Sequence, residues 1–250
     1  MENMKQTSSE QHDPDRHMNG TSAKNTVTIC FTGDKPKDLC GYDIENYKLF
    51  TKQFVEKLSS IAENILKHDD TEIRWISGGA QGFQQMAFWT VDIIKQKHPE
   101  WNMKMKNIVY QPFPNQPDRW HEGLFGPTQY KNMLQCADEI KCLTEENPND
   151  YNAMSDAMTR QNHQMVNDSD YVIALYPADN WNTAMRSNTC ECMRYACENR
   201  KDIMQIKYTT GGNKLSISAT KILSNTGGND MKNLLYAYGT AQETIKYATA

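Results

Sequence analysis

The sequence predicts an α/β protein with a Rossmann-like three-layer fold and a mostly parallel sheet. Two observations carry this prediction. Short β-rich runs alternate along the chain with segments of helical periodicity, which is the order of successive βαβ units. One run, at residues 170–176, is almost continuously apolar, which suits a strand covered on both faces of the sheet.

The individual elements follow from the spacing of apolar residues. Tyr47, Phe50, Phe54, Leu58, Ile61 and Ile65 recur at intervals of three and four, which predicts a helix with one buried stripe. The predicted strands are 26–32, 72–77, 107–110, 139–143, 170–176 and 202–208. The remaining predicted helices are 86–94, 130–137, 154–166 and 189–199, with a weaker helical pattern at 231–238.

Composition indicates one domain behind a polar tail. Residues 1–24 are rich in Ser, Asn, Asp and His and show no apolar periodicity, so we expect a disordered N-terminal tail. Residues 25–250 are then a single domain, whose C-terminal extension from about residue 209 is punctuated by glycine pairs and less regular.

Charge and cysteine usage exclude several classes of function. The formal net charge of −4 argues against general nucleic-acid binding, which needs a basic face. No run approaches the ~20 apolar residues of a membrane span, and no secretory signal is evident, so we expect a cytoplasmic protein. The seven cysteines form no CxxC pair. We interpret Cys190, Cys192 and Cys197 as buried structural thiols rather than metal ligands, and we expect no metal and no cofactor.

Three polar segments follow predicted strands, where open parallel sheets bind ligands. The first begins at Gly33, the second is the run from Gly78 to Phe83, and the third is Ser187 to Thr189. Glycines at such turns let backbone amides approach a phosphate, but they also serve ordinary tight turns, and the sequence favours neither reading. Ser187 to Thr189 is more simply read as a helix N-cap.

Six motifs in order resemble the YpsA-like branch of the SLOG superfamily, whose relatives include LOG-type nucleotide hydrolases and DprA. The matching segments are Phe31 to Pro36 (FTGHRP in the family), Ser77 to Gln84 (SGGAxGxD), Pro112 to Gln116 with Trp120 (PFxxQ and Trp), Tyr130 to Asp138, Arg160 to Asp170 (RNxxMVDxSD with one inserted residue), and Ser187 to Ala196 (GGTxxxxxYA).

This resemblance implies a Rossmann-like fold that binds nucleotides or their derivatives at the strand ends, and some relatives cleave N-glycosidic bonds. Carried over residue by residue, it implies a set of ligand-binding residues. These are Gly33, Lys35, Pro36, Gly78, Gly79, Gly82, Phe83, Gln84, Phe113, Arg160, Ser187, Asn188 and Thr189.

The chain departs from the family pattern in ways that bear on catalysis. Gln84 stands where the family has an acidic residue, and a carboxamide cannot act as a general base. Ser187 and Asn188 replace the two glycines of the GGT loop, and Lys35 keeps a positive charge without the guanidinium fork. Glu191 is the candidate catalytic carboxylate, although a favourable helix-dipole charge is the simpler reading.

Three functions remain open at this stage. The retained glycine loop without its carboxylate favours a protein that senses or sequesters a nucleotide-derived signal, such as an ADP-ribose-like or cyclic nucleotide, without efficient turnover. The polar, divergent sequence would suit a phage counter-defence protein of this kind. The alternatives are a nucleotide N-glycosidase or phosphoribohydrolase that uses Glu191, and an interaction protein with a vestigial pocket. The resemblance also implies a homodimer or higher homo-oligomer.

Overall fold

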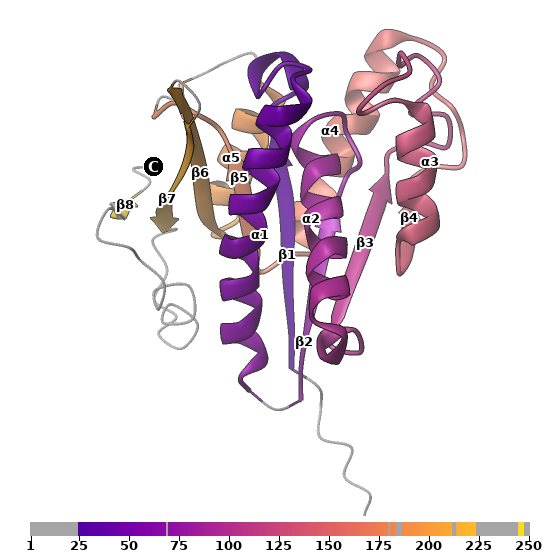
Figure 1. The fold of residues 1–250 in the computed structure, drawn as a ribbon. Helices are drawn as coiled ribbons and strands as arrows, with labels where there is room; N and C mark the ends of the chain where they lie inside the picture. Colours follow the sequence, from indigo (N-terminus) through magenta and orange to yellow (C-terminus); the bar gives the residue numbers. More distant parts are fainter. Residues whose placement is uncertain are drawn as a thin grey trace, which may run out of the picture.

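The computed structural model describes residues 25–223 and 245–247, apart from residues 69, 180, 184–186 and 212–213. It has three layers, with a central sheet between two layers of helices (Figure 1). The predicted Rossmann-like α/β fold is therefore confirmed.

Six parallel strands form the body of the sheet. The strand order is β4-β3-β2-β1-β5-β6-β7-β8, in which β7 is antiparallel to β6 and β8 is parallel to β7. The bounds are β1 Asn25–Gly33, β2 Thr71–Ser77, β3 Met105–Gln111, β4 Glu139–Cys142, β5 Tyr171–Leu175, β6 Asp202–Gly211, β7 Lys214–Leu223 and β8 Ile245–Tyr247.

Five helices connect these strands within the described residues, and each falls where apolar periodicity predicts one. Their bounds are α1 Ile44–Leu66, α2 Phe83–Lys97, α3 Pro127–Cys136, α4 Tyr151–Asn167 and α5 Asn188–Glu198. Two single-turn 3₁₀ helices, η1 Pro36–Asp38 and η2 Pro99–Trp101, each start at a proline, whose fixed φ suits a first helical position.

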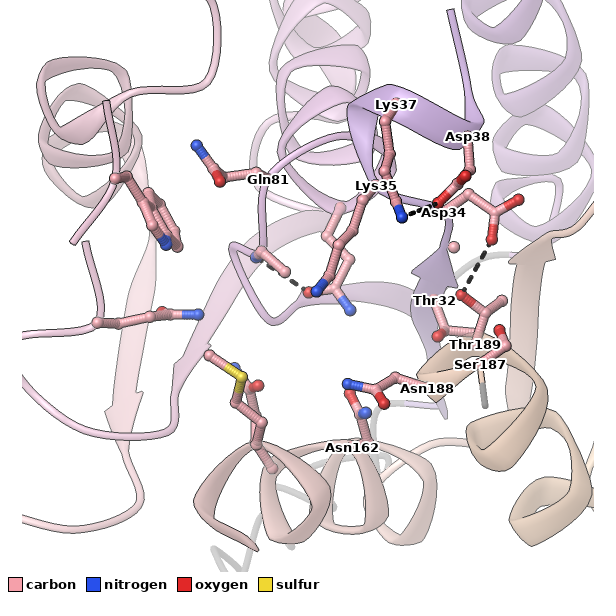
Figure 2. Close-up of a pocket in the computed structure, with 17 residues that line it drawn as sticks. Thr32, Asp34, Lys35, Lys37, Asp38, Gln81, Asn162, Ser187, Asn188 and Thr189 are labelled. Atoms are coloured by element: carbon pink, nitrogen blue, oxygen red, sulfur yellow. Dashed lines mark hydrogen bonds and ion pairs between the residues drawn. The ribbon is translucent and has the colours of Figure 1, made fainter. Parts of the chain in front are cut away.

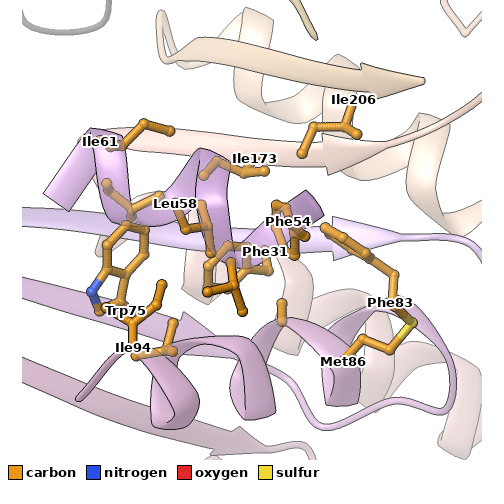
Figure 3. Packing of buried hydrophobic residues seen from close by; sticks show 14 of the residues in the cluster. Phe31, Phe54, Leu58, Ile61, Trp75, Phe83, Met86, Ile94, Ile173 and Ile206 are labelled. Carbon is orange, nitrogen blue, oxygen red and sulfur yellow. The ribbon is translucent and has the colours of Figure 1, made fainter. Parts of the chain in front are cut away.

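The first layer of the core lies between the sheet and helices α1 and α2. Asp43 caps α1 by accepting hydrogen bonds from the amides of Glu45 (2.9 Å) and Asn46 (3.3 Å). The predicted stripe of α1 is buried against β1, where Phe31 stacks on Trp75 with ring centroids 5.6 Å apart (Figure 3). This packing fixes the ends of β1 and β2 relative to each other.

The second layer lies on the opposite face, under α4 and α5. Cys30, Val172 and Ile76 point into it, because successive side chains of a strand alternate between faces. Strands β1, β2 and β5 are thus covered on both sides, which explains why β5 is so uniformly apolar.

The order of the strands creates a switch point beside β1. The chain runs outward from β1 through β2 and β3 to β4, and then returns to place β5 on the other side of β1. Open α/β sheets bind ligands in the crevice outside the carboxyl ends of the strands at such a point. The loops after β1, β2 and β5 lie around this crevice.

Two strands, β7 and β8, were not predicted. In the C-terminal extension, β7 pairs antiparallel with β6, and Gly211 lies opposite Lys214. The period-two alternation of Leu215, Ile217 and Ala219 after a glycine pair is the sequence signal that would have indicated it. The expected helix at 231–238 and the expected tail at 1–24 lie outside the described residues.

Candidate functional site

A pocket of about 310 Å³ lies at the switch point. Its walls come from the loops after β1 and β2, the β3–α3 loop, one face of α4 and the start of α5 (Figure 2). The lining residues are Thr32, Gly33, Asp34, Lys35, Lys37, Asp38, Ala80, Gln81, Gln84, Gln116, Trp120, Met158, Gln161, Asn162, Ser187, Asn188 and Thr189.

The loop after β1 contributes the ionisable side of the pocket. Gly33 and Lys35 line it as the sequence predicts, whereas Pro36 is buried and opens η1. Lys35 is exposed and points toward the middle of the pocket (Figure 2). Lys37 pairs with Asp38 at 3.8 Å across largely exposed side chains, and such exposed pairs contribute little to stability.

The glycines of the second loop serve its packing against neighbouring parts of the protein. Gly79 has a φ of +69°, and a Cβ there would lie 2.5 Å from the Tyr130 ring. A Cβ on Gly82, at a φ of +93°, would lie 2.6 Å from the carbonyl oxygen of Asp34. Neither residue lines the pocket, nor does Gly78; the loop lines it with Ala80 and Gln81.

Two predicted site residues are part of the core instead of the lining. Phe83 is fully buried and packs edge-on against Phe31, and its ring fills the space that a Cβ on Gly33 would need, at 2.4 Å. Phe113 is 1% exposed and is also absent from the lining. Both residues therefore belong to the core that supports the site loops, and neither faces the pocket.

The start of α5 reaches the pocket with all three predicted residues. The Ser187 hydroxyl caps the helix by accepting from the Cys190 amide at 3.2 Å. Asn188 is exposed toward the pocket, and Thr189 is buried and donates from its hydroxyl to Asp34 at 3.4 Å. This places the positive end of the helix dipole at the pocket wall.

The structure corrects the register of the motif on α4. Arg160 is exposed and does not line the pocket, whereas Gln161, Asn162 and Met158 do. Because α4 is one continuous helix, an inserted residue would rotate everything after it by ~100°. The motif is better matched without the insertion, so that Gln161 stands where the family pattern has arginine.

Glu191 lies beside the pocket and outside its lining. Its carboxylate is 2.6 Å from Nε2 of His163, and the His163 ring stacks on Tyr195 with centroids 3.6 Å apart. The pairing links α4 to α5. Glu191 thus has a partner within the protein.

Asp34 is the buried carboxylate of the pocket, and sequence reasoning missed it. It is 8% exposed, and its own backbone carbonyl accepts from the Phe83 amide at 3.2 Å. Burial raises the pKa of Asp34 to about 7, and the negative charge of Asp38 adds to this while the Thr189 hydroxyl opposes it. The signal was its place in the first strand-end loop, where the family pattern has histidine.

Gln84 lies at the base of the pocket and is 5% exposed. Its Oε1 accepts from the Ala80 amide at 3.2 Å, which fixes the orientation of the carboxamide. The Nε2 group of Gln84 donates to no group of the described chain. A neutral donor therefore occupies the position of the family's carboxylate.

Two features of the described residues bear on metal binding and on the fully buried cysteine of β1 as a nucleophile. They hold no group of three His, Cys, Asp or Glu side chains arranged to bind a metal ion. Cys30 is fully buried, and burial raises the pKa of its thiol to about 12, which leaves little nucleophilic thiolate at neutral pH.

The fold and the pocket together define a Rossmann-like α/β protein with a pocket at its switch point. Residues 29–210 match the YspA SLOG family, and the chain belongs to this family, as the sequence motifs predicted. A curated relative is the uncharacterized SPbeta prophage-derived protein YoqJ of Bacillus subtilis (strain 168). It is 32% identical over 149 residues, which cover 56% of this chain and 78% of the relative.

Family membership supports a nucleotide-related ligand-binding role. Across the described part of the chain, no helix has both the length and the apolar character needed to cross a bilayer.

Proposed function

We propose that the protein binds a nucleotide-derived small molecule in the switch-point pocket and holds it without efficient turnover. The observation that carries the proposal is the convergence of Gly33, Lys35 and the start of α5 on one pocket of about 310 Å³. A helix N-terminus and a lysine suit an anionic group. The pocket is also at the lower end of the size range for small-molecule sites.

The lack of efficient turnover is inferred from position 84. Hydrolysis of an N-glycosidic bond uses a carboxylate to activate water or to stabilise the oxocarbenium-like transition state. Gln84 supplies no such group, and Glu191 is paired with His163 outside the lining. Binding by itself requires only the helix terminus and the cation.

A second candidate function rests on Asp34. This carboxyl lines the pocket, and burial raises its pKa to about 7, which is the range in which a general acid or base works best. A nucleotide N-glycosidic hydrolase would then use Asp34 and not Glu191. The two candidates differ in one observable, which is release of free base.

Binding can be tested by isothermal titration with AMP, ADP-ribose and cyclic AMP. The matched variants are Asn188→Trp, which fills the pocket, and Asn152→Trp, which adds the same ring to an exposed position of α4 outside the lining. We expect Asn188→Trp alone to weaken binding at least tenfold. Equal affinities in the two variants would place the ligand elsewhere, and no binding by the wild type would favour an interaction protein.

Turnover can be tested by chromatography of the same mixtures. We expect the bound nucleotide to be recovered intact. Release of free base at several per second would contradict the proposal. Loss of that release in Asp34→Asn, with Glu191→Gln still active, would then assign catalysis to Asp34, and the reverse pattern would assign it to Glu191.

We also propose a biological role for this binding. The relative YoqJ is described as SPbeta prophage-derived. A phage protein that retains a host nucleotide signal would gain from slow turnover, since each captured molecule stays captured. Counter-defence by sequestration is therefore the role we propose for this chain.

A further inference from the structure

The polarity of the pocket changes from one side to the other. All its ionisable lining residues, namely Asp34, Lys35, Lys37 and Asp38, come from the segment after β1. The side formed by α4, the β2–α2 segment and the β3–α3 loop contributes only uncharged groups to the lining. The pocket thus offers two different environments to one ligand.

The uncharged side is rich in carboxamides that are buried and only partly used by the protein. Asn162 is 7% exposed, yet its side chain makes no hydrogen bond to the described chain. It points from α4 into the pocket (Figure 2). Its carboxamide faces the pocket and is not sealed off inside the protein, so its donor and acceptor are available to a ligand that enters the pocket.

Two glutamines beside Asn162 are each half-satisfied. Gln161 donates from Nε2 to the carbonyls of Gly78 (2.8 Å) and Tyr110 (2.5 Å), which leaves Oε1 as an available acceptor. Gln84 accepts at Oε1 from Ala80, which leaves Nε2 as an available donor. These bonds fix both side chains before any ligand enters, so binding does not have to order them.

Apolar groups accompany this amide cluster. Met158 precedes Gln161 and Asn162 by three and four residues and shares their face of α4. Trp120 is half-buried and is held edge-on against Tyr130, with centroids 5.3 Å apart. Such surfaces suit the faces of a flat ring, whereas a sugar would need hydroxyl partners on most sides.

We propose that Gln84, Gln161 and Asn162 form a nucleobase subsite that reads the polar edge of an uncharged base through paired donors and acceptors. Asn and Gln carboxamides present a donor and an acceptor side by side, as base edges do. The anionic part of the ligand then lies toward Lys35 and the start of α5. This inference rests on the proposed function, because it assumes that the pocket holds a nucleotide.

The test compares nucleotides with the same molecule lacking its base. Isothermal titration would use AMP, GMP, CMP and UMP against ribose 5-phosphate, each with the full chain. We expect at least one nucleotide to bind ten or more times more tightly than ribose 5-phosphate. Ribose 5-phosphate binding as tightly as every nucleotide would overturn the subsite, even though the pocket would still bind a phosphorylated ligand.

The variants assign the effect to the amides. Asn162→Leu removes a side chain with no partner in the described chain, so the protein should keep its melting temperature while losing at least tenfold in affinity for the preferred nucleotide. Its affinity for ribose 5-phosphate should stay within twofold. Asn152→Leu is the matched control on the same helix and should change neither affinity.

A second variant shows whether a loss of base preference in Asn162→Leu comes only from a folding defect. Gln84→Glu keeps the acceptor for the Ala80 amide but removes the donor, and it should also reduce the preference for one base. If both Asn162→Leu and Gln84→Glu kept the base preference of the wild type, the subsite would be wrong. If the wild type bound neither these four nucleotides nor ADP-ribose and cyclic AMP, the proposed function would fail, and the subsite with it.

Discussion

Asp34 is a buried carboxyl that receives little hydrogen bonding from the rest of the protein. It is buried at the end of β1, and its only side-chain hydrogen bond within the described residues is a long one from Thr189, at 3.4 Å. Burying a carboxyl without a cation partner disfavours its ionised form. Buried, perturbed carboxyls of this kind gather at functional sites.

The raised pKa of Asp34 predicts how the free energy of unfolding changes with pH. Because folding raises the pKa of Asp34 to about 7, its contribution to stability is complete below the unfolded pKa of ~4 and is lost as pH rises through about 7. Asp34→Asn cannot ionise. We expect the variant to gain on the order of 2 kcal/mol over the wild type between pH 5 and pH 8.

Urea unfolding at the two pH values measures this difference. Asp156→Asn, at an exposed position of α4, is the control and should track the wild type at both. A gain by Asp34→Asn that is equal at pH 5 and pH 8 would show that Asp34 is ionised throughout.

At the scale of elements, the loops after β1 and β2 act as one packed unit. Phe83 donates its amide to the Asp34 carbonyl, and Gly82 allows that approach. The pocket wall therefore depends on a glycine that does not itself line the pocket.

Two glycines with positive φ provide a matched test of this unit. Gly82 and Gly41 have φ values of +93° and +62°, but a Cβ on Gly82 would clash with backbone whereas one on Gly41 would meet nothing within 4 Å. We expect Gly82→Ala to lose roughly 2–4 kcal/mol and Gly41→Ala about 1 kcal/mol in urea unfolding. Similar losses in both would show that the two loops are not packed as described.

Helix α4 provides a second test at this scale. Its pocket face carries Met158, Gln161 and Asn162, and Arg160 points elsewhere. We expect Arg160→Ala to leave nucleotide affinity within twofold in isothermal titration. A tenfold loss would restore the register with the inserted residue, in which Arg160 contacts the ligand.

The sequence predicted those elements whose signal is local. Helix α1 has an uninterrupted apolar stripe, and β5 is apolar throughout, so both were predicted near their observed bounds. The pairing of β7 with β6 was missed, because it depends on contacts between two strands that period-two patterning signals only weakly.

The site was predictable only in outline. Its three loops were predicted from strand ends, but Asp34 and Asn162 were not, because their importance comes from burial in a pocket that forms only after folding. Gly79 and Phe83 show the converse. Both belong to a sequence motif that predicts ligand contact, yet both are needed for the packing that supports the site.

At the scale of the whole molecule, we predict that residues 1–24 can be removed without loss of stability. The composition changes at Asn25-Thr26, where β1 begins, and the match to the family starts at residue 29. A chain beginning at Asn25 should keep its melting temperature within a few degrees by differential scanning calorimetry. A larger drop would show that the removed segment packs on the domain.

We propose that this pocket captures a nucleotide-derived molecule and leaves it intact. The most direct measurement is mass spectrometry of the small molecules released from purified protein after incubation with a cellular nucleotide extract and removal of unbound material. We expect an intact nucleotide derivative from the wild type and none from Asn188→Trp. Release of free base and sugar phosphate, or the same molecule from both proteins, would contradict it.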